Sequence, residues 1–411
     1  MIPTPEKRIV DFENLGFGMF VHFGLYSQLG MGEWTFSVHK RDMNEYKKLA
    51  DTFTAEDFDA DELVLTAKNA GCKYITLTTR HHEGFSLFDT KGLCDFDAPH
   101  SAAKRDLIRE FVDACNRHGI IPFFYHTTLD WYQPDFNDDF DAYLEYLRKS
   151  VEVLCKNYGK IGGLWFDGNW SKKDADWKES ELYATIRKYQ PDAIIVNNTG
   201  LSARGEVGNP EIDSVTFEQG RPTPMNREGM SKYLAAEMCY TLNDHWGCGK
   251  NDFNYKSPKD LIESLCACRR VGANLLLNIG PTAQGGVDPY QRELMNLVGK
   301  WVKIYGEAIY NGKPHPAFCG NQKNFVLKSD DCLYFFVHDL GRGGSKHVTV
   351  DGECSSDFVF HGVSEQIDTV TWLDNGEVLD FEHKDDVFSL FATNYSYGVS
   401  TCVRVAKATL K

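Results

Sequence analysis

Short apolar runs alternate with amphipathic stretches through most of the chain, and this alternation limits the possible folds more than any other feature. Continuous apolar runs are typical of strands buried on both faces, as in parallel sheets. Eight segments have this character: 18–24, 73–78, 120–125, 163–170, 193–197, 214–217, 237–241 and 273–278. Eight strands that alternate with helices predict an α/β fold, a (β/α)8-like barrel of the TIM type.

The residues between these runs follow helical spacing. In 104–118, Leu107, Ile108 and Phe111 recur on one helical face, and Gly119 follows as a C-cap. Further helices are expected at 61–70, 140–158, 178–189, 258–271 and 289–305. The segments 199–210 and 220–229 lack this spacing, so we expect loops there and an irregular barrel.

The sequence pattern changes after residues 313–316. Shorter apolar runs follow, separated by turn residues at near-regular spacing, which is typical of antiparallel β structure. These runs cover 324–327, 333–337, 347–350, 358–360, 369–373, 387–391 and 400–405. We therefore predict two domains, a catalytic (β/α)8-like barrel over 1–312 and a C-terminal antiparallel β-sandwich over 313–411.

The composition argues against several kinds of partner and location. A net charge of −15 disfavours nucleic acids and anionic membranes. No apolar run reaches the roughly 18 residues of a membrane span. Residues 1–8 lack the apolar region of a secretory signal, and the initial Met1 argues against one removed earlier. Twelve cysteines without a CxxC pattern suit free thiols in a reducing cytoplasm, where we expect the protein.

Polar and aromatic residues follow the predicted strands at the points where these strands end. In a parallel barrel these ends meet at one face, where active sites form. The residues concerned are His22, His81, His82, Tyr125, His126, Trp165, Asp167 and Glu218. We therefore expect a pocket with several histidines, aromatic rings and two carboxylates.

Asp167 and Glu218 allow a functional and a structural interpretation. Two carboxylates are what glycoside cleavage requires, one as nucleophile and one as acid/base. The tryptophans beside Asp167 would supply flat walls for a sugar ring. Alternatively, Asp167 caps the following segment and Glu218 is a solvated loop acid, with Glu206 and Glu211 as nearby rivals.

The histidines raise the alternative of a metal site. His22, His81, His82 and His126 are residues of the type that binds zinc in hydrolases. Their spacing fits no common ligand pattern, and adjacent His81 and His82 would point apart on an extended chain. Neutral imidazoles that hydrogen-bond sugar hydroxyls fit better, so we expect no metal and no cofactor.

Several segments together resemble the α-L-fucosidases of glycoside hydrolase family 29. The resemblance covers most of residues 10–312 and extends more loosely into the β domain. The segments are Gly18-Met19-Phe20-Val21-His22-Phe23-Gly24-Leu25-Tyr26-Ser27, Glu33-Trp34, Thr79-Arg80-His81-His82-Glu83-Gly84-Phe85, Leu129-Asp130-Trp131-Tyr132, Leu164-Trp165-Phe166-Asp167-Gly168, and Asn274-Leu275-Leu276-Leu277-Asn278-Ile279-Gly280-Pro281 with Gly285-Gly286-Val287. The resemblance implies a retaining exo-glycosidase that removes terminal α-L-fucosyl residues from fucosylated oligosaccharides or glycoconjugates by double displacement.

The same resemblance assigns roles to individual residues. It implies that Asp167 is the nucleophile and Glu218 the acid/base. The residues that it implies for substrate binding are His22, Glu33, Trp34, His81, His82 and Tyr125, with Trp165 and Trp246 forming an apolar wall near the C6 methyl group.

One departure from the family pattern concerns the leaving-group side. Many members carry an arginine in an Asn-Asp-Arg segment after the fifth strand, whereas this chain has Val196-Asn197-Asn198-Thr199-Gly200. Arg204 and Arg221 are the candidates to replace it. The alternatives are a fucose-binding protein without strong catalysis and a metal-dependent barrel hydrolase, while linkage preference and a homo-oligomeric state stay open.

Overall fold

The computed structural model describes residues 1–201, 203–344 and 357–411. By its internal contacts the chain divides into two compact units, Met1–Lys256 with Ala273–Asn296 and Ser257–Gly272 with Leu297–Lys411. The functional division into 1–312 and 313–411 stays a prediction, and the two units are described separately.

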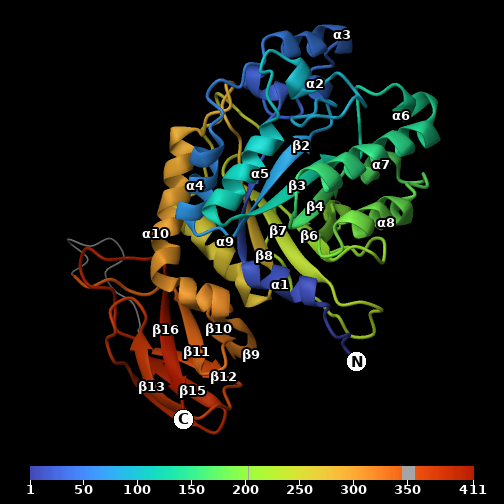
Figure 1. The fold of residues 1–411 in the computed structure, drawn as a ribbon. Helices are drawn as coiled ribbons and strands as arrows, with labels where there is room; N and C mark the ends of the chain where they lie inside the picture. The colour runs from blue at the N-terminus through green and yellow to red at the C-terminus, as the bar shows by residue number, and fades with distance from the viewer. Residues whose placement is uncertain (202, 345–356) are drawn as a thin grey trace. The chain divides into compact units, whose positions relative to one another are not determined.

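Eight parallel strands close into a barrel in the order of the chain, with β1 pairing with both β2 and β8 (Figure 1). These strands are β1 (Phe17–Val21), β2 (Tyr74–Arg80), β3 (Ile121–Thr127), β4 (Gly163–Asp167), β5 (Ile194–Asn197), β6 (Ser214–Glu218), β7 (Ala235–Thr241) and β8 (Asn274–Ile279). Their nearly continuous burial explains why they appear in the sequence as unbroken apolar runs. The predicted barrel is confirmed.

Long helices follow β1 to β4 on the outside of the barrel, as Figure 1 shows. They are α4 (Ala60–Ala70), α5 (Leu107–His118), α7 (Phe140–Asn157) and α8 (Glu179–Tyr189). Asp59, Asp106 and Asp139 begin α4, α5 and α7 with side chains that accept backbone N–H bonds. Gly119 ends α5 at a φ of 70°, as its sequence position predicted.

The irregular part of the barrel lies where the sequence predicted loops. Between β5 and β6 the described residues form one 3-10 helix, Thr199–Leu201, and the segment between β6 and β7 has no helix. The pairing of β5 with β6 is reduced to Val196 opposite Ser214. Shorter elements in other loops are α2 (Thr35–Val38), α3 (Met43–Tyr46), α6 (Asp135–Asp138), η1 (Leu25–Leu29), η2 (Lys47–Asp51), η3 (Ala98–His100) and η4 (Asn169–Lys172).

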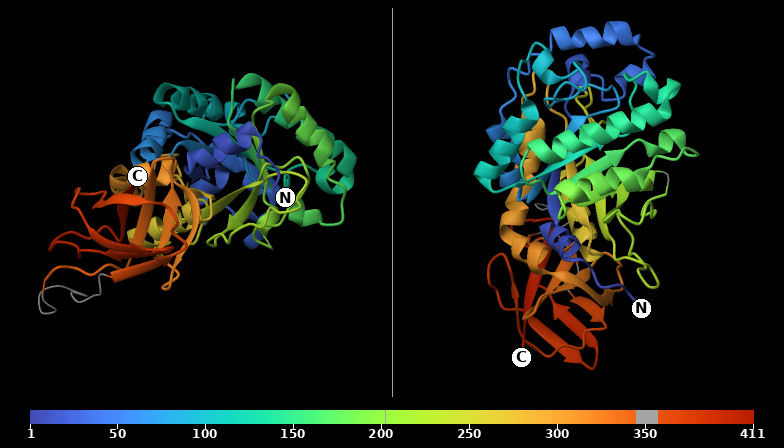
Figure 2. Two further views of the ribbon diagram at one scale, coloured as in Figure 1. Left: turned by 90° about the horizontal axis from the view of Figure 1, so that it is seen from below. Right: turned by 45° about the vertical axis from the view of Figure 1, so that its right-hand side comes forward.

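Helix α1 (Lys7–Leu15), which the sequence pattern did not predict, covers the amino ends of the strands (Figure 2, left). Its buried residues are Ile9 and Phe12. The ring of Phe12 lies 5.7 Å from that of Tyr74 and 5.8 Å from that of Phe123, inside the barrel core. This end of the barrel is therefore closed, and the opposite end carries the strand-end residues.

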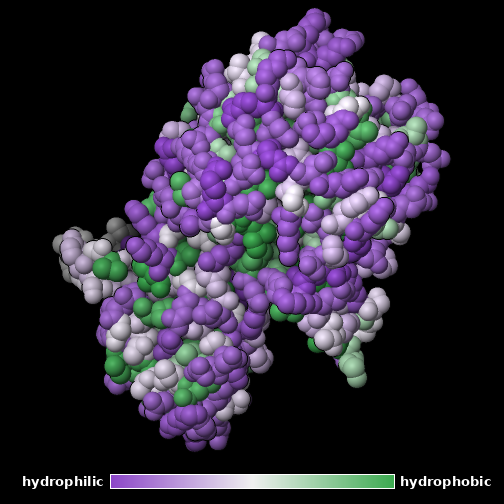
Figure 3. Space-filling model, in the orientation of Figure 1, coloured by the Kyte–Doolittle hydropathy of each residue, from purple (hydrophilic) through white to green (hydrophobic). Residues whose placement is uncertain are grey.

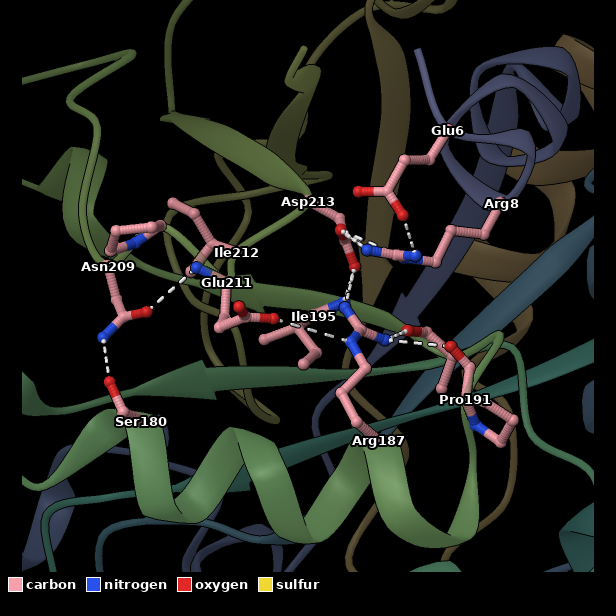
Figure 4. A network of polar contacts seen from close by, with 12 residues as sticks. Glu6, Arg8, Ser180, Arg187, Pro191, Ile195, Asn209, Glu211, Ile212 and Asp213 are labelled. Carbon is pink, nitrogen blue, oxygen red and sulfur yellow. Dashed lines mark hydrogen bonds and ion pairs between the residues drawn. The ribbon is translucent and has the colours of Figure 1, made fainter. Parts of the chain in front are cut away.

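The buried carboxylate of Asp213 links α1 to the part of the barrel where β5 and β6 pair through a single pair of residues. Asp213 precedes β6 and accepts bonds from Arg8 (3.0 Å), Arg187 (2.7 Å) and the backbone N–H of Ile195 (Figure 4). It also accepts a 2.8 Å bond from Lys232. Burial alone would raise the pKa of Asp213, but these cations outweigh it and hold the pKa below its usual value.

The second unit contains an antiparallel sheet in the order β13-β16-β11-β10-β9-β12-β15-β14. Its strands are β9 (Lys313–Cys319), β10 (Phe325–Lys328), β11 (Cys332–His338), β12 (Asp357–His361), β13 (Ile367–Trp372), β14 (Asp380–Lys384), β15 (Val387–Phe391) and β16 (Val403–Leu410). The unit also holds α9 (Pro258–Arg270) and the last part of α10 (Pro289–Asn311). Strands β9 and β14 were not predicted, and the strand expected at 347–350 lies outside the described residues.

The eight-stranded sheet folds over on itself. Three strands separate β11 from β15, so on a flat sheet these two would lie about 19 Å apart. Instead, the rings of Phe335 on β11 and Phe388 on β15 are 4.6 Å apart. The two halves therefore pack face to face around one apolar core, which confirms the predicted β-sandwich.

Hydrophilic side chains cover most of the face drawn in Figure 3. Within the described ranges, no helix is both long enough and apolar enough to cross a membrane.

We predict that Asp213→Asn lowers the free energy of unfolding by about 3–5 kcal/mol at pH 7, because three cations lose a buried partner. The folded-state pKa of Asp213 is depressed, so its contribution is complete above the unfolded pKa and is lost as pH falls through the folded pKa. The difference in the free energy of unfolding between wild type and variant, measured by urea denaturation, should therefore become smaller as the pH is lowered.

Asp192→Asn is the matched control, since Asp192 forms a solvent-exposed pair with Lys160 at 3.7 Å. Its effect should stay within about 0.5 kcal/mol. Equal stability of Asp213→Asn and this control at pH 7 would contradict the role given to the Asp213 network.

Candidate active site

Asp167 stands at the carboxyl end of β4, and three side chains donate hydrogen bonds to it. Trp170 Nε1 lies 2.8 Å and Asn198 Nδ2 3.3 Å from Oδ1, while the Tyr125 hydroxyl lies 3.1 Å from Oδ2. Gly168 follows the end of the strand, and its φ of 125° turns the chain sharply. Asp167 is thus held in one orientation by donors from β3, from the loop after β5 and from its own loop.

Glu218 ends β6 and shares a donor with Asp167. The Asn198 Nδ2 atom lies 2.6 Å from Glu218 Oε2, and the Asn198 Oδ1 atom accepts a 2.8 Å bond from Thr216. The bond from Thr216 fixes the orientation of the Asn198 amide, so its NH2 group faces both carboxylates. These two contacts place Asp167 Oδ1 and Glu218 Oε2 no more than about 6 Å apart, so both carboxylates lie against the same amide group.

The two carboxylates differ in their electrostatic surroundings. Burial, followed by the nearby charge of Asp167, raises the pKa of Glu218 to about 7. The hydrogen bond from Asn198 opposes this rise because it stabilises the ionised form. Glu218 can therefore hold a proton near neutral pH while Asp167, with three donors, is set up to accept bonds as a carboxylate.

Most of the predicted site residues line one narrow pocket of about 60 Å³ around this pair. The predicted residues that line it are His22, Trp34, His81, Tyr125, Trp165, Asp167, Glu218 and Trp246. Phe20, Trp170, Asn198, Leu201 and Cys239 complete the lining. The pocket therefore combines a carboxylate pair with a largely aromatic wall.

The histidines of the pocket are neutral near pH 7. Burial lowers the pKa of His22 well below its usual value and that of His81 to about 3. The Asn278 amide donates to Trp246 O at 2.7 Å, which turns its Oδ1 toward His22 Nδ1 at 2.7 Å. His22 therefore donates through Nδ1 and carries its lone pair on Nε2, the tautomer that can accept a bond from a hydroxyl group.

Glu33 and His82, also predicted to bind substrate, do not line the pocket but contact residues that do. Glu33 Oε2 accepts bonds from the backbone N–H groups of Trp246 (3.1 Å) and Gly247 (2.8 Å). His82 Nε2 lies 3.6 Å from Asp167 Oδ2, and its ring packs 5.3 Å from that of Trp34. Their direct contact with a substrate stays a prediction.

Three contacts at the site have no counterpart in the sequence analysis. Trp170, which was expected only as a flat wall, and Asn198, which was given no role, both donate a hydrogen bond to Asp167. Glu237 lies on β7 in the barrel interior, where it accepts bonds from Trp165 Nε1 (3.0 Å) and the Tyr74 hydroxyl. Burial raises the pKa of Glu237 to about 7. An acid inside an apolar run gave no signal that it would orient an aromatic wall.

Arg204 is the arginine that reaches the end of β6. Its Nε lies 2.8 Å from the backbone oxygen of Glu218, and a terminal nitrogen lies 3.1 Å from that of Gln219. It therefore contacts the main chain of the acid and not the carboxylate. Among the residues that the structure describes, no group of three or more His, Cys, Asp or Glu side chains is arranged to hold a metal ion.

Comparison with known proteins identifies the family. The sequence model of the α-L-fucosidase family matches residues 6–307. The chain belongs to the α-L-fucosidase family. The tissue α-L-fucosidase of Mus musculus is 30% identical over 345 residues, which cover 76% of this chain and 75% of the mouse protein. The resemblance inferred from the sequence segments is confirmed.

Solved fucosidase structures share the fold. The α-L-fucosidase isoenzyme 1 from Paenibacillus thiaminolyticus is 29% identical with a TM-score of 0.83, covering 98% of this chain and 99% of that one. A family 29 α-L-fucosidase from Bacteroides thetaiotaomicron, trapped as a covalent intermediate with 2-fluoro-fucosyl fluoride, is 22% identical with a TM-score of 0.84, covering 100% and 98%. Because the Bacteroides protein is only 22% identical, its similarity supports the fold alone.

Proposed function

We propose that the protein is a retaining exo-α-L-fucosidase that hydrolyses terminal α-L-fucosyl units of fucosylated oligosaccharides or glycoconjugates. The observation that carries this proposal is the carboxylate pair Asp167 and Glu218, linked through Asn198 within a small aromatic pocket.

In the first step, ionised Asp167 attacks C1 of the fucosyl unit and Glu218 gives its proton to the leaving oxygen. The C1–O bond to the aglycone breaks as the bond to the Asp167 carboxylate forms. In the second step, Glu218 accepts a proton from water, and the water oxygen displaces Asp167 from C1. The two inversions at C1 produce retention of configuration.

Two considerations favour retention over inversion. Asp167 Oδ1 and Glu218 Oε2 lie within about 6 Å of each other through the shared Asn198 amide, and a retaining pair requires such a close approach. In addition, the similar Bacteroides fucosidase has been trapped as a covalent intermediate, the species that double displacement requires.

The remaining pocket residues divide into hydroxyl-binding and apolar groups. We assign His22, His81 and Tyr125 to the sugar hydroxyls, because neutral imidazoles and a phenol both donate and accept hydrogen bonds. Trp165 and Trp246 provide an apolar surface for the C6 methyl group, and Trp34 a further ring. Glu33 and His82 complete the binding set.

The alternatives are less favoured. A fucose-binding protein without catalysis would not need two oriented carboxylates, one of which has its pKa raised to about 7. A metal-dependent hydrolase would lose activity on exhaustive chelation, and we expect full activity to remain.

Every cysteine that the structure describes is a free thiol, which supports the proposal of a reducing cytoplasmic location.

Azide distinguishes the two proposed roles through the configuration of the product. Asp167→Ala should lower kcat on an activated aryl α-L-fucoside by more than about 10³-fold. Added azide should then restore turnover by one displacement and yield the inverted β-fucosyl azide. Glu218→Ala should still form the fucosyl-enzyme from this substrate, and azide should release it as the retained α-fucosyl azide.

Asp174→Ala is the control, since Asp174 is an exposed acid in the same loop, and its turnover should match wild type. Product configuration is read by NMR. Near wild-type turnover of Asp167→Ala would exclude Asp167 as the nucleophile. If azide neither accelerates turnover of Glu218→Ala nor yields the α-fucosyl azide, Glu218 is excluded as the acid/base.

The pH dependence tests the bond between Asn198 and Glu218. Because Glu218 must be protonated to donate, kcat/KM should fall as pH rises through about 7. Asn198→Ala removes a donor that favours ionised Glu218, so the pKa of Glu218 should rise and the alkaline limb should move to higher pH.

Asn197→Ala serves as the matched control, because the neighbouring Asn197 amide bonds Glu179 and Tyr183 instead. The alkaline limb of the kcat/KM profile of Asn197→Ala should lie at the same pH as that of wild type. A limb that does not move in Asn198→Ala, or moves equally in both variants, would contradict the proposed contact.

A further inference from the structure

A second and larger cavity opens at the same end of the barrel as the catalytic pocket. It measures about 890 Å³, within the range of about 300–1,000 Å³ typical of small-molecule sites. Its lining comes from the loops after three strands: 27–30 after β1, 248–255 after β7 and 280–291 after β8. None of its residues takes part in the catalytic machinery described above.

One short segment separates the two cavities. Trp246 lines the catalytic pocket, and Cys248, two residues later, lines the larger cavity. A span of two residues is about 7 Å at most, so the cavities lie on either side of this segment. A Cβ on Gly280 would approach the backbone of Gly247 at 2.7 Å, so glycine there permits the close packing of the wall.

The walls of the larger cavity are fixed by backbone bonds. Gly32 N donates to Cys248 O and Lys250 N to Gly30 O, each at 2.9 Å, which joins the loops after β1 and β7. The turn after β8 is closed by a 2.9 Å bond from Thr282 N to Gly286 O. Such a cavity can bind a ligand without paying much ordering entropy.

Aromatic rings line this cavity. The side chain of Phe253 is 83% exposed and that of Tyr290 is 56% exposed, and the Tyr290 ring packs edge-on against Tyr255 at 4.5 Å. Rings exposed to this extent beside a cavity are available to stack against a ligand.

The lining carries charges of both signs. Lys250 is an exposed cation, while Asp252 accepts a 2.8 Å bond from His245 Nδ1 and Asp288 accepts bonds from the backbone N–H groups of Tyr290 and Gln291. Because neither sign of charge dominates, the lining suits a neutral ligand better than a charged one. Exposed rings beside polar groups of both signs match the face and the edge of a pyranose ring.

We propose that this cavity is a second carbohydrate-binding site, which takes neutral pyranose units that carry no fucose. The choice of ligand class rests on the proposed fucosidase function. The sugar units belong either to the glycan whose fucosyl end occupies the catalytic pocket or to a separate glycan chain. Phe253 provides the principal stacking surface.

The thiol of Cys248 reports occupancy of the cavity without reference to catalysis. The wild-type protein is treated with iodoacetamide, and alkylation of the Cys248 peptide is followed by mass spectrometry, with half-buried Cys94 and Cys402 as internal references. Lactose, N-acetyllactosamine or cellobiose at millimolar concentration should slow alkylation of Cys248 alone. If none of them does so, the proposal is overturned.

Phe253→Ala tests the stacking surface, with Tyr397→Ala, an aromatic residue 72% exposed in the second unit, as the matched control. Protection of Cys248 should be lost in Phe253→Ala and kept in the control. Equal protection in both variants would contradict the role of Phe253 and with it the site as proposed.

Hydrolysis then distinguishes the two sources of the sugar. If both cavities hold one glycan, Phe253→Ala should lower kcat/KM for a branched fucosylated oligosaccharide by about five- to thirtyfold, with an aryl fucoside unaffected. If only the protection of Cys248 is lost, the cavity binds a separate chain. A wild-type protein that cleaves no fucoside, yet shows protection of Cys248, would refute the proposed function and leave the binding site standing.

Discussion

The site depends on the close approach of two carboxyl groups in a place shielded from water. Burial and the nearby charge of Asp167 both disfavour the ionised form of Glu218. The hydrogen bonds decide where the single negative charge resides. Asp167 receives donors from Trp170, Asn198 and Tyr125, whereas among the described residues the carboxylate of Glu218 accepts a bond only from the shared Asn198 amide. The charge therefore belongs on Asp167 and the proton on Glu218, which is the distribution that the first displacement requires.

The walls of the pocket depend on polar residues that stand behind them. Glu237 holds the indole of Trp165 from inside the barrel, and Glu33 holds the main chain at Trp246. Asn278 donates to the backbone oxygen of Trp246 and accepts from His22 Nδ1, so it links the Trp246 side of the pocket to this histidine. A flat apolar surface for a sugar is thus positioned by buried acids and an amide, each satisfied by specific donors or acceptors. Loss of such a partner would misplace a ring without removing it.

The sequence predicted the barrel well because buried parallel strands appear as unbroken apolar runs, and the strand ends then indicated the pocket. Elements with weak patterns were missed. Helix α1 buries only Ile9 and Phe12, β9 contains two prolines, and β14 is largely polar. Contacts between distant segments, such as Glu33 with Gly247, have no local signal. Asn198 was noticed only because an arginine was expected nearby.

The replacement of that arginine has a chemical consequence for the acid. A guanidinium bound directly to the Glu218 carboxylate would stabilise its ionised form strongly and lower its pKa. Here the carboxylate instead accepts a bond from the neutral amide of Asn198, while Arg204 donates to the backbone oxygens of Glu218 and Gln219. The opposing effects leave the pKa of Glu218 at about 7. A group with this pKa can give a proton in the first displacement and accept one in the second near neutral pH, which is the double role that retention asks of it.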